Sequence, residues 1–566
     1  MARTRLFGQL RRIAARTLAS RSPESEDRRS AAVRWTRRQL TLGVAPLAVG
    51  SLLPGCSDDD AERRPGAERV AVVGAGLAGL HCAYRLQQSG VNVSVLEAAS
   101  RVGGRTFTAR DDAYDGQLFE LGGELIDSNH ATMLALAEEL DITLDDRFEE
   151  GIQADVWFAN GAEVPEETIV EQFTAVAERM AEAMTAADED DAAFSELDEV
   201  PLSDWLEENV PSAEYPELNL VLNVAYRGEF GLETSEQSTL NLIYLIGSDE
   251  PDPFRIFGES DERYHAREGS DAFATRLADK LEDGVVNLNT QVTRILGGDE
   301  RGFTLQVTDT KSGQKRELNV DYVVVAVPFS VLRKVRIDAP ISEEKQQIID
   351  ELGYGTNAKV MAQFDARVWR EEHAKSGSAT TDLPLQQTWD SSIGQPGKRG
   401  ILTNFLGGQA GVEVGEGDPE DYYTGLLGDI DRLFPGASDS YRAGSARRMH
   451  WPSYEHTLGS YTCYRPGQWA FWGLEGERQG NLLFCGEHTS MEFQGWMEGA
   501  AESGARVAGE VLQDLKLAPS AELEGLLGTE NNAARGLSRG GVPVTRFPRR
   551  QLAVLSRSAA RAFARR

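Results

Sequence analysis

A glycine-rich turn near residue 74 has the residue types and spacing of a nucleotide-phosphate site. Gly74, Gly76 and Gly79 follow an apolar run in a GxGxxG pattern, and Glu97 stands at the end of the next apolar run. Glycines allow a tight turn and close backbone approach to phosphates, the following helix directs N–H groups at them, and the acid accepts the ribose hydroxyls. Strand, turn, helix, second strand and acid follow in this order, which predicts a dinucleotide site.

Further glycine and arginine residues extend this pattern. Arg101 and Arg105 enclose two glycines directly after the acid, and Gly122 and Gly123 follow within the next twenty residues. With these segments the chain resembles the flavin-containing amine oxidase family, which includes monoamine, polyamine and L-amino acid oxidases. The resemblance implies FAD as cofactor, with both arginines near its phosphates and the glycine pair against the isoalloxazine ring. Many members have an arginine where this chain has Ala99, which weakens one adenosine-side contact.

The C-terminal half contains a matching strand, turn and helix. An apolar run at 481–485 leads into Gly486 and Glu487, and a helix is expected to begin near Met497. By the resemblance, Glu487 meets the ribityl or phosphate region of FAD, and the helix start near Met497 offers N–H groups to a flavin carbonyl. The resemblance also places the backbone of Val292 against adenine and Trp451 beside the flavin ring. The alternative is an ordinary C-terminal strand and helix.

Lys359 is the candidate catalytic residue. It matches the family's lysine that holds a water at flavin N5, and a buried lysine with a lowered pKa suits such a contact. The alternative is a surface lysine on a strand. Because the chain has only nine lysines and uses arginine as its default basic residue, the functional interpretation is favoured.

Four positions in the C-terminal part of the chain concern the flavin attachment and the substrate. Some relatives bond their flavin covalently to a cysteine at the position of Ser460, so serine predicts non-covalent FAD, and Cys463 is too far along the chain to replace that cysteine. Tyr461 and Trp496 match two aromatic walls around the amine, whose π faces attract and align it. Both could equally be core aromatics.

Glu124 bears on the substrate class. Several amino acid oxidases have an arginine for the substrate carboxylate shortly after the Leu-Gly pair, and here Glu124 stands in that region without an arginine. A carboxylate there repels an amino acid's acid group and attracts a second ammonium, which favours a primary amine or a diamine. Glu124 could instead be a structural acid, and an arginine from elsewhere, such as Arg227, could restore an amino acid substrate.

These residues together predict an enzyme. The resemblance implies oxidative deamination of an amine by hydride transfer to flavin N5, with O2 reduced to H2O2 and the imine hydrolysed to an aldehyde and ammonia or a smaller amine. An L-amino acid oxidase is the first alternative. A flavin desaturase or isomerase acting on C–C bonds, or a lipoprotein that binds FAD without catalysis, are further alternatives.

The elements that must position this chemistry form an α/β protein with two domains. Residues 69–130, 266–335 and 450–515 are expected to make a discontinuous, Rossmann-like FAD-binding domain, with strands at 285–292 and 303–325. Residues 131–265 and 336–449 are expected to form an α+β substrate domain. A length of 566 residues is sufficient for two or more domains.

The charge of the chain limits its possible binding partners. The formal net charge of the chain is −32. Residues 1–56 carry +8 and residues 531–566 carry +9, so the residues between them carry −49. This strongly negative charge disfavours nucleic-acid binding by the main body.

The N-terminal segment contains possible export signals. Arg37 and Arg38 precede a short apolar run that resembles a twin-arginine export signal, and Cys56 closes a possible lipobox that would carry a lipid anchor. Residues 57–68 are expected to be a linker and 516–566 a disordered basic tail. No cysteine or histidine spacing suggests a metal site.

Overall fold

The computed structural model describes residues 68–527, apart from residues 112–113, 152, 250 and 300–301. The expected export signal, the possible lipobox at Cys56, all but the last residue of the linker and most of the basic tail lie outside the described residues. The expected disorder is wrong for the described part of the tail, 516–527, because Leu523 and Leu526 pack into the core of the first body. Within the described part, no helix combines the length and the apolar character needed to cross a membrane.

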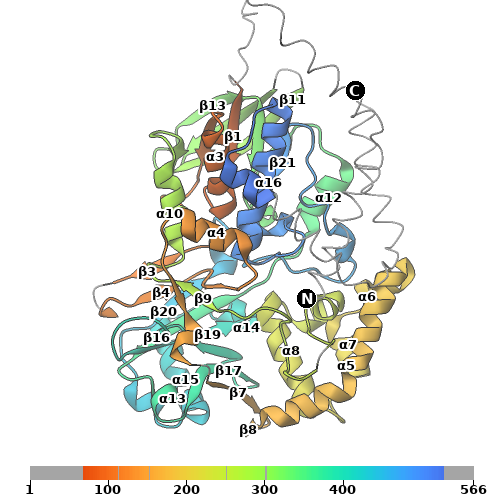
Figure 1. Cartoon of the computed structure of the whole chain (residues 1–566), viewed down its shortest axis with the longest axis vertical. Coiled ribbons are helices and arrows are strands. Elements are labelled where there is room, and N and C mark those ends of the chain that lie inside the picture. Colours follow the sequence, from red (N-terminus) through yellow and green to blue (C-terminus); the bar gives the residue numbers. More distant parts are fainter. Residues whose placement is uncertain (1–67, 112–113, 152, 250, 300–301, 528–566) are drawn as a thin grey trace, which may run out of the picture.

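A five-stranded parallel sheet organises the first body of the protein, in the upper part of Figure 1. Its order is β10 (Val286–Asn287), β2 (Asn92–Leu96), β1 (Arg69–Val73), β14 (Tyr322–Val325) and β21 (Leu482–Phe484). Its strands therefore come from three distant stretches of the chain. The α/β fold class expected from the sequence is confirmed.

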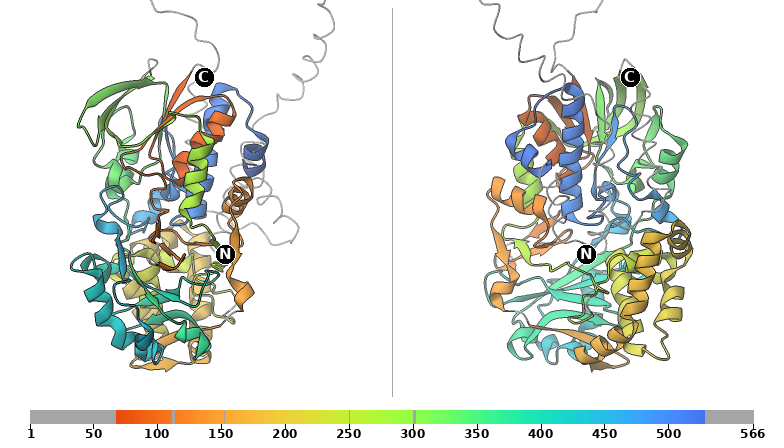
Figure 2. Two further views of the ribbon diagram at one scale, coloured as in Figure 1. Left: turned by 90° about the vertical axis from the view of Figure 1, so that its left-hand side faces the viewer. Right: turned by 45° about the vertical axis from the view of Figure 1, so that its right-hand side comes forward.

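Both faces of this sheet are buried, which explains its nearly continuous apolar strands. Val70 and Val72 pack into one apolar cluster, whereas Ala71 and Val73 pack into another. The helices α3 (Leu77–Gln88), α10 (Asp271–Lys280) and α16 (Met497–Leu515) contribute to the first cluster. Figure 2 shows these helices side by side along the sheet.

A four-stranded sheet packs beside this core. Its order is β13 (Lys315–Val320), β12 (Gly302–Asp309), β11 (Thr290–Asp299) and β15 (Arg336–Asp338). The expected strand at 285–292 is wrong as one element, because the backbone turns at Asn289 with φ 56° and separates β10 from β11. The short helices α11 (Phe329–Leu332) and α12 (Glu343–Glu351) follow.

The second body is built on a seven-stranded sheet, in the lower part of Figure 1. Its order is β20 (Arg447–His450), β16 (Ala358–Phe364), β19 (Gly400–Leu406), β18 (Gln387–Asp390), β17 (Lys375–Thr381), β7 (Ala154–Ala159) and β8 (Ala162–Val164). The helices of this body are α5 (Glu166–Glu189), α6 (Asp191–Glu199), α7 (Leu202–Asn209), α8 (Pro216–Phe230), α9 (Leu240–Ile243), α13 (Val368–Glu371), α14 (Gly408–Glu413) and α15 (Pro419–Leu433).

Short elements connect the two bodies. A two-stranded sheet pairs β3 (Thr108–Arg110) with β4 (Leu118–Glu120), and a three-stranded sheet has the order β5 (Leu125–Ile126), β9 (Tyr264–Ala266), β6 (Leu144–Asp146). Helix α4 (Ala131–Glu139) contacts α16 near the N-termini of both helices. There the Glu498 carboxylate of α16 accepts the backbone N–H groups of Thr132 and Met133 at 2.8 Å. This contact fixes α4 against the first body.

Candidate active site

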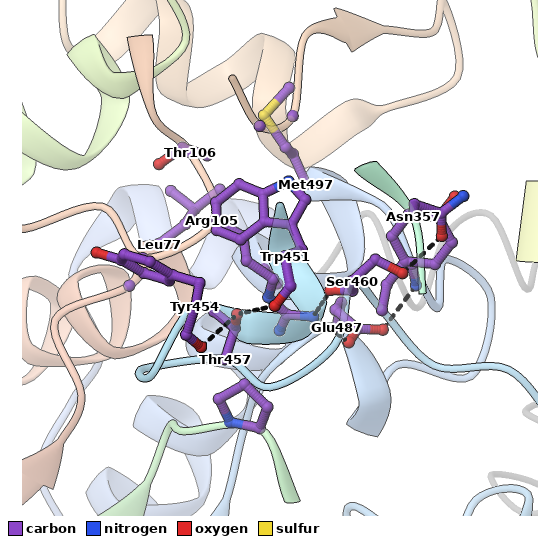
Figure 3. Close-up of a pocket in the computed structure, with 18 of the residues that line it drawn as sticks. Leu77, Arg105, Thr106, Asn357, Trp451, Tyr454, Thr457, Ser460, Glu487 and Met497 are labelled. Atoms are coloured by element: carbon purple, nitrogen blue, oxygen red, sulfur yellow. Dashed lines mark hydrogen bonds and ion pairs between the residues drawn. The ribbon is translucent and has the colours of Figure 1, made fainter. Parts of the chain in front are cut away.

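A cavity of about 1110 Å³ lies between the two bodies. It is lined by residues of the glycine-rich turn after β1, of β16 and β18 in the second body, and of the start of α16. Figure 3 shows part of its lining. The site residues expected from the sequence that line this cavity are Gly74, Gly76, Glu97, Arg101, Arg105, Gly122, Gly123, Glu124, Val292, Lys359, Trp451, Ser460, Tyr461, Gly486, Glu487, Trp496 and Met497. Gly79 lies beneath the turn, where an added Cβ would be 2.1 Å from the carbonyl oxygen of Gly74.

The turn after β1 and the first residues of α3 line the cavity. Gly74 has φ 107°, a conformation that favours glycine, and α3 begins at Leu77 without a side-chain cap. The Glu97 carboxylate accepts the backbone N–H groups of Ala75 at 2.7 Å and Ala99 at 2.8 Å, so it also holds the turn in place. An uncapped helix N-terminus is a ready anion site, and this one fits a pyrophosphate.

The two arginines after Glu97 have different surroundings. Arg101 donates to the carbonyl oxygens of Val102 at 3.0 Å and Gly104 at 2.7 Å, and its guanidinium lies 3.7 Å from the centroid of the Phe107 ring. It therefore shapes its own loop. Arg105 donates to the carboxylate of Glu487 at 2.7 Å and to the carbonyl oxygen of Ser460 at 2.8 Å (Figure 3).

Glu487 ties the C-terminal turn to Arg105. Its carboxylate is buried and also accepts the N–H of Gly495 at 2.8 Å. Burial alone raises the pKa of Glu487, but the Arg105 guanidinium and further favourable contacts outweigh it and hold this pKa below its usual range. The ion pair thus joins two segments that are 382 residues apart in sequence.

A second uncapped helix meets the other end of the cavity. Helix α16 begins at Met497 without a side-chain cap. The Met497 side chain lies against Gly123, where an added Cβ would be 2.9 Å from its Cγ and Sδ, so only glycine leaves room. Trp451 is buried on the other side of this turn, 3.2 Å from where a Cβ of Gly122 would lie. Gly122, Gly123, Trp451 and Met497 all line the cavity, and the two glycines keep the turn free of side chains there.

Lys359 on β16 points at the Glu120–Glu124 turn. Its Nζ lies 2.9 Å from the carbonyl oxygen of Gly122, 3.2 Å from that of Glu120 and 2.9 Å from Oε2 of Glu124. The side chains of Lys359 and Glu124 are both 6% exposed. The expected buried lysine is therefore present, and the structure brings it against the acid that the sequence suggested for the substrate.

Aromatic residues form one side of the cavity. Tyr461 and Trp496 both line it, and the Tyr461 hydroxyl donates to the carbonyl oxygen of Gly228 at 3.3 Å. Sequence reasoning did not single out His130, which packs edge-on against Trp496 with ring centroids 5.5 Å apart. A histidine preceding a helix gave no signal of this contact.

The lining contributed by the second body is negatively charged. Asp155, Glu229, Asp261 and Glu262, here called the acidic wall, line it together with Trp157 and Trp389. The described residues of the second body contribute one lysine or arginine to the lining, and this is Lys359. Sequence analysis did not identify the acidic wall, because isolated acids are common in a chain this acidic.

Ser460 and Cys463 occupy different environments. The Ser460 hydroxyl lies in the cavity lining and donates to Oδ1 of Asn357 at 2.6 Å (Figure 3). Cys463 is fully buried and is not part of that lining. Asn357, two residues before Lys359, also donates to the carbonyl oxygen of Gly228 at 2.6 Å, so it links the serine to α8.

The donor set fits FAD. Two uncapped helix N-termini suit a pyrophosphate and a flavin carbonyl, Glu97 follows the second strand as a ribose-binding acid does, and the Gly122–Gly123 turn lines the cavity without side chains. These features occur at separate places along one continuous cavity, as an extended dinucleotide requires.

Comparison with known proteins agrees with this geometry. The chain is similar to a putative flavin-containing monoamine oxidase of Mycobacterium tuberculosis, with 28% identity over 78% of this chain and 96% of the relative. It is also similar to a putative L-amino-acid oxidase of Bacillus subtilis, with 25% identity over 78% of this chain and 94% of the relative.

Solved structures share the fold. Cyclohexylamine oxidase from Brevibacterium oxydans superposes with a TM-score of 0.69 and 22% identity, covering 79% of this chain and 99% of that one. Putrescine oxidase bound to putrescine gives a TM-score of 0.66 at 22% identity, with the same coverage of both chains. The model of flavin-containing amine oxidoreductases matches residues 77–512. The chain therefore belongs to the flavin-containing amine oxidoreductase family.

Proposed function

We propose that the protein oxidatively deaminates an amine that carries no carboxylate. Bound FAD would accept a hydride from the carbon that bears the amine and pass the electrons to O2, giving H2O2 and an imine that water hydrolyses to an aldehyde and ammonia or a smaller amine. The observation that carries the substrate class is the acidic wall, through which the second body contributes four carboxylic acids to the cavity lining and, among its described residues, one cation, Lys359.

The protein's own residues supply position and electrostatics. Tyr461 and Trp496 line the cavity and would offer π faces to an amine. Lys359 places a positive charge behind the Gly122–Gly123 turn. The uncapped start of α16 directs N–H groups at the same end, where negative charge would be stabilised.

An amino acid substrate is less well supported. A carboxylate needs a cation beside the amine. Arg227, the arginine expected as an alternative source, is paired with Glu233 at 2.8 Å and does not line the cavity, and Lys359 is paired with Glu124. The acidic wall instead attracts an ammonium group and would repel a carboxylate. A diamine gains one further attraction over a monoamine, so diamines are favoured among the amines.

Three amines of equal chain length test this proposal with purified, FAD-loaded protein. We expect H2O2 from 1,5-diaminopentane and n-pentylamine, with the diamine having the lower KM, and little from L-lysine, which differs from the diamine only by its carboxylate. Comparable oxidation of L-lysine would overturn the substrate class. A bound flavin that no amine reduces under anaerobic conditions would overturn the enzymatic function.

We further propose non-covalent FAD. The side chain at position 460 is a hydroxyl engaged with Asn357, and Cys463 lies outside the cavity lining. Acid precipitation of the protein should leave all yellow colour in the supernatant. Flavin that stays with the precipitated polypeptide would contradict this.

Export by the twin-arginine pathway is also a proposal. It is supported by Arg37 and Arg38 before the apolar run that ends near Cys56. Replacing both arginines with lysine should retain the protein in the cytoplasm of the producing cell. A Cys56→Ala variant that loses membrane association would support a lipid anchor, whereas unchanged fractionation would exclude it.

A further inference from the structure

The Lys359 ammonium has a protein acceptor for each of its hydrogens. A lysine ammonium has three N–H donors. The three oxygens within 3.2 Å of Nζ belong to the Glu120 carbonyl, the Gly122 carbonyl and the Glu124 carboxylate. The ammonium therefore donates to two backbone carbonyls and one carboxylate of the same turn.

Glu124 is held in place from a second side. Its Oε2 also accepts the indole N–H of Trp389 at 3.2 Å, and the Lys359 Nζ lies 5.1 Å from the centroid of the Trp389 ring. Burial raises the pKa of Glu124, but Lys359 first and His265 next outweigh this and bring the pKa below its usual value. The carboxylate is thus ionised, and its charge is balanced inside the protein.

The other charged groups near this pair are arranged around the same turn. His265 on β9 lies 3.2 Å from the Glu120 carboxylate, which also accepts the N–H of Ser270 at 2.8 Å and the hydroxyl of Thr108 at 2.7 Å. Glu262 of the acidic wall faces Glu124 from the cavity side. Of these groups, Glu124 is the one whose carboxylate contacts the Lys359 ammonium, because Glu120 contacts it through its backbone carbonyl.

We propose that Glu124 is a positioning residue that keeps Lys359 charged, and that the charged Lys359 clamps the Glu120–Gly122 turn beneath the ring end of the cavity. Two of the three ammonium hydrogen bonds go to backbone carbonyls of this turn, so they fix the place of Gly122 and Gly123. In this arrangement Glu124 does not bind the second ammonium group of a diamine, and the carboxylates of the acidic wall bind it instead. The inference rests on the proposed function only where it concerns amine turnover.

A pH series on FAD-loaded protein tests the charge. A buried lysine without a counter-ion loses its proton at lower pH, because desolvation disfavours the ammonium. Between about pH 6 and 9, the visible flavin spectrum of Glu124→Gln should show one ionisation that the wild-type spectrum lacks. Glu124→Asp, which retains the charge, should restore the wild-type profile. A Glu124→Gln profile identical to that of the wild type would overturn the proposal.

A double-mutant cycle tests the pairing without using activity. Lys359→Met leaves the Glu124 carboxylate buried and unpaired, so it should lower the Tm strongly. Adding Glu124→Gln removes that charge, and the double variant should melt several degrees above Lys359→Met. A double variant that melts at or below Lys359→Met would overturn the pairing. If Lys359→Met does not fold, recovery of folded protein on adding Glu124→Gln gives the same answer.

Glu139→Gln is a matched control, because Glu139 pairs with the buried Arg85 far from the cavity lining. It should lower the Tm without introducing an ionisation in the flavin spectrum. Failure of the proposed function would appear separately, as wild-type protein that no amine reduces, while the spectra and the Tm cycle still report on Lys359 and Glu124.

Discussion

The guanidinium of Arg105 and the carboxylate of Glu487 form an ion pair of 2.7 Å that joins the two halves of the cofactor cavity. Glu487 is 5% exposed and Arg105 is 24% exposed, so the carboxylate is the more strongly desolvated partner. Loss of the arginine leaves that carboxylate buried beside the cavity, which costs more than loss of both groups.

Arg105→Met should therefore destabilise the protein by about 2–4 kcal/mol and weaken FAD retention. The double variant with Glu487→Gln should recover part of the stability, because it removes the unpaired charge. Thermal unfolding with and without added FAD measures both effects. Equal Tm values for the single and double variants would contradict a buried ion pair.

His130 is expected to orient Trp496. Its Nδ1 accepts the N–H of Asp127 at 3.0 Å, so the proton of this neutral ring is on Nε2, which lies 3.3 Å from Oδ2 of Asp127. His130→Ala should raise KM for a bulky arylalkylamine by about tenfold, or about 1.4 kcal/mol, with a smaller effect on n-pentylamine. His81→Gln, a change at another buried histidine, is the control, and an equal effect of both variants on the KM ratio would exclude orientation of Trp496.

The acidic wall predicts a pH dependence of diamine binding. The pKa of Glu262 is raised to about 7, chiefly because burial disfavours its charged form. The neighbouring carboxylates of Asp127, Glu124 and Asp155 raise this pKa further, whereas Arg147 lowers it. Glu262 thus gains its negative charge as pH rises through about 7, and KM for 1,5-diaminopentane should fall relative to that for n-pentylamine over this interval. Glu262→Gln should abolish the change in the KM ratio, and an unaltered pH dependence in that variant would rule out Glu262 as its source.

His488 predicts a loss of stability in acid. Burial lowers its pKa from 6.5 to about 3, and in the described structure neither ring nitrogen has a hydrogen-bond partner. A group with a lowered folded pKa contributes stability above pH 6.5 that disappears as pH falls toward about 3, here up to about 5 kcal/mol.

His488→Phe should keep the ring contact with Phe329 and lessen this acid sensitivity, with little change in Tm at pH 8. Unfolding midpoints between pH 4 and pH 8 give the measurement. A slope of Tm against pH as steep as that of the wild type would show that other groups, such as His81 with its similarly lowered pKa, dominate acid unfolding.

Local patterns in the sequence were sufficient to predict the cofactor-binding elements. The apolar run before Gly74, the helix after it and the strand ending at Glu97 have their expected places, because a parallel strand buried on both faces must be apolar and a phosphate-binding turn needs glycine. The strand at 482–484 and the helix from Met497 follow the same rule. Family resemblance then identified Lys359 and Trp496 as cavity residues.

Only the tertiary structure decided what those side chains contact. Lys359 and Glu124 are 235 residues apart, and Arg105 and Glu487 are 382 apart, so nothing local in the sequence specifies either ion pair. The acidic wall likewise forms because β7, α8 and the segment before β9 converge on one cavity. Sequence determines periodicity and turn chemistry over short distances, whereas the balance of buried charges depends on which distant segments the packed core brings together.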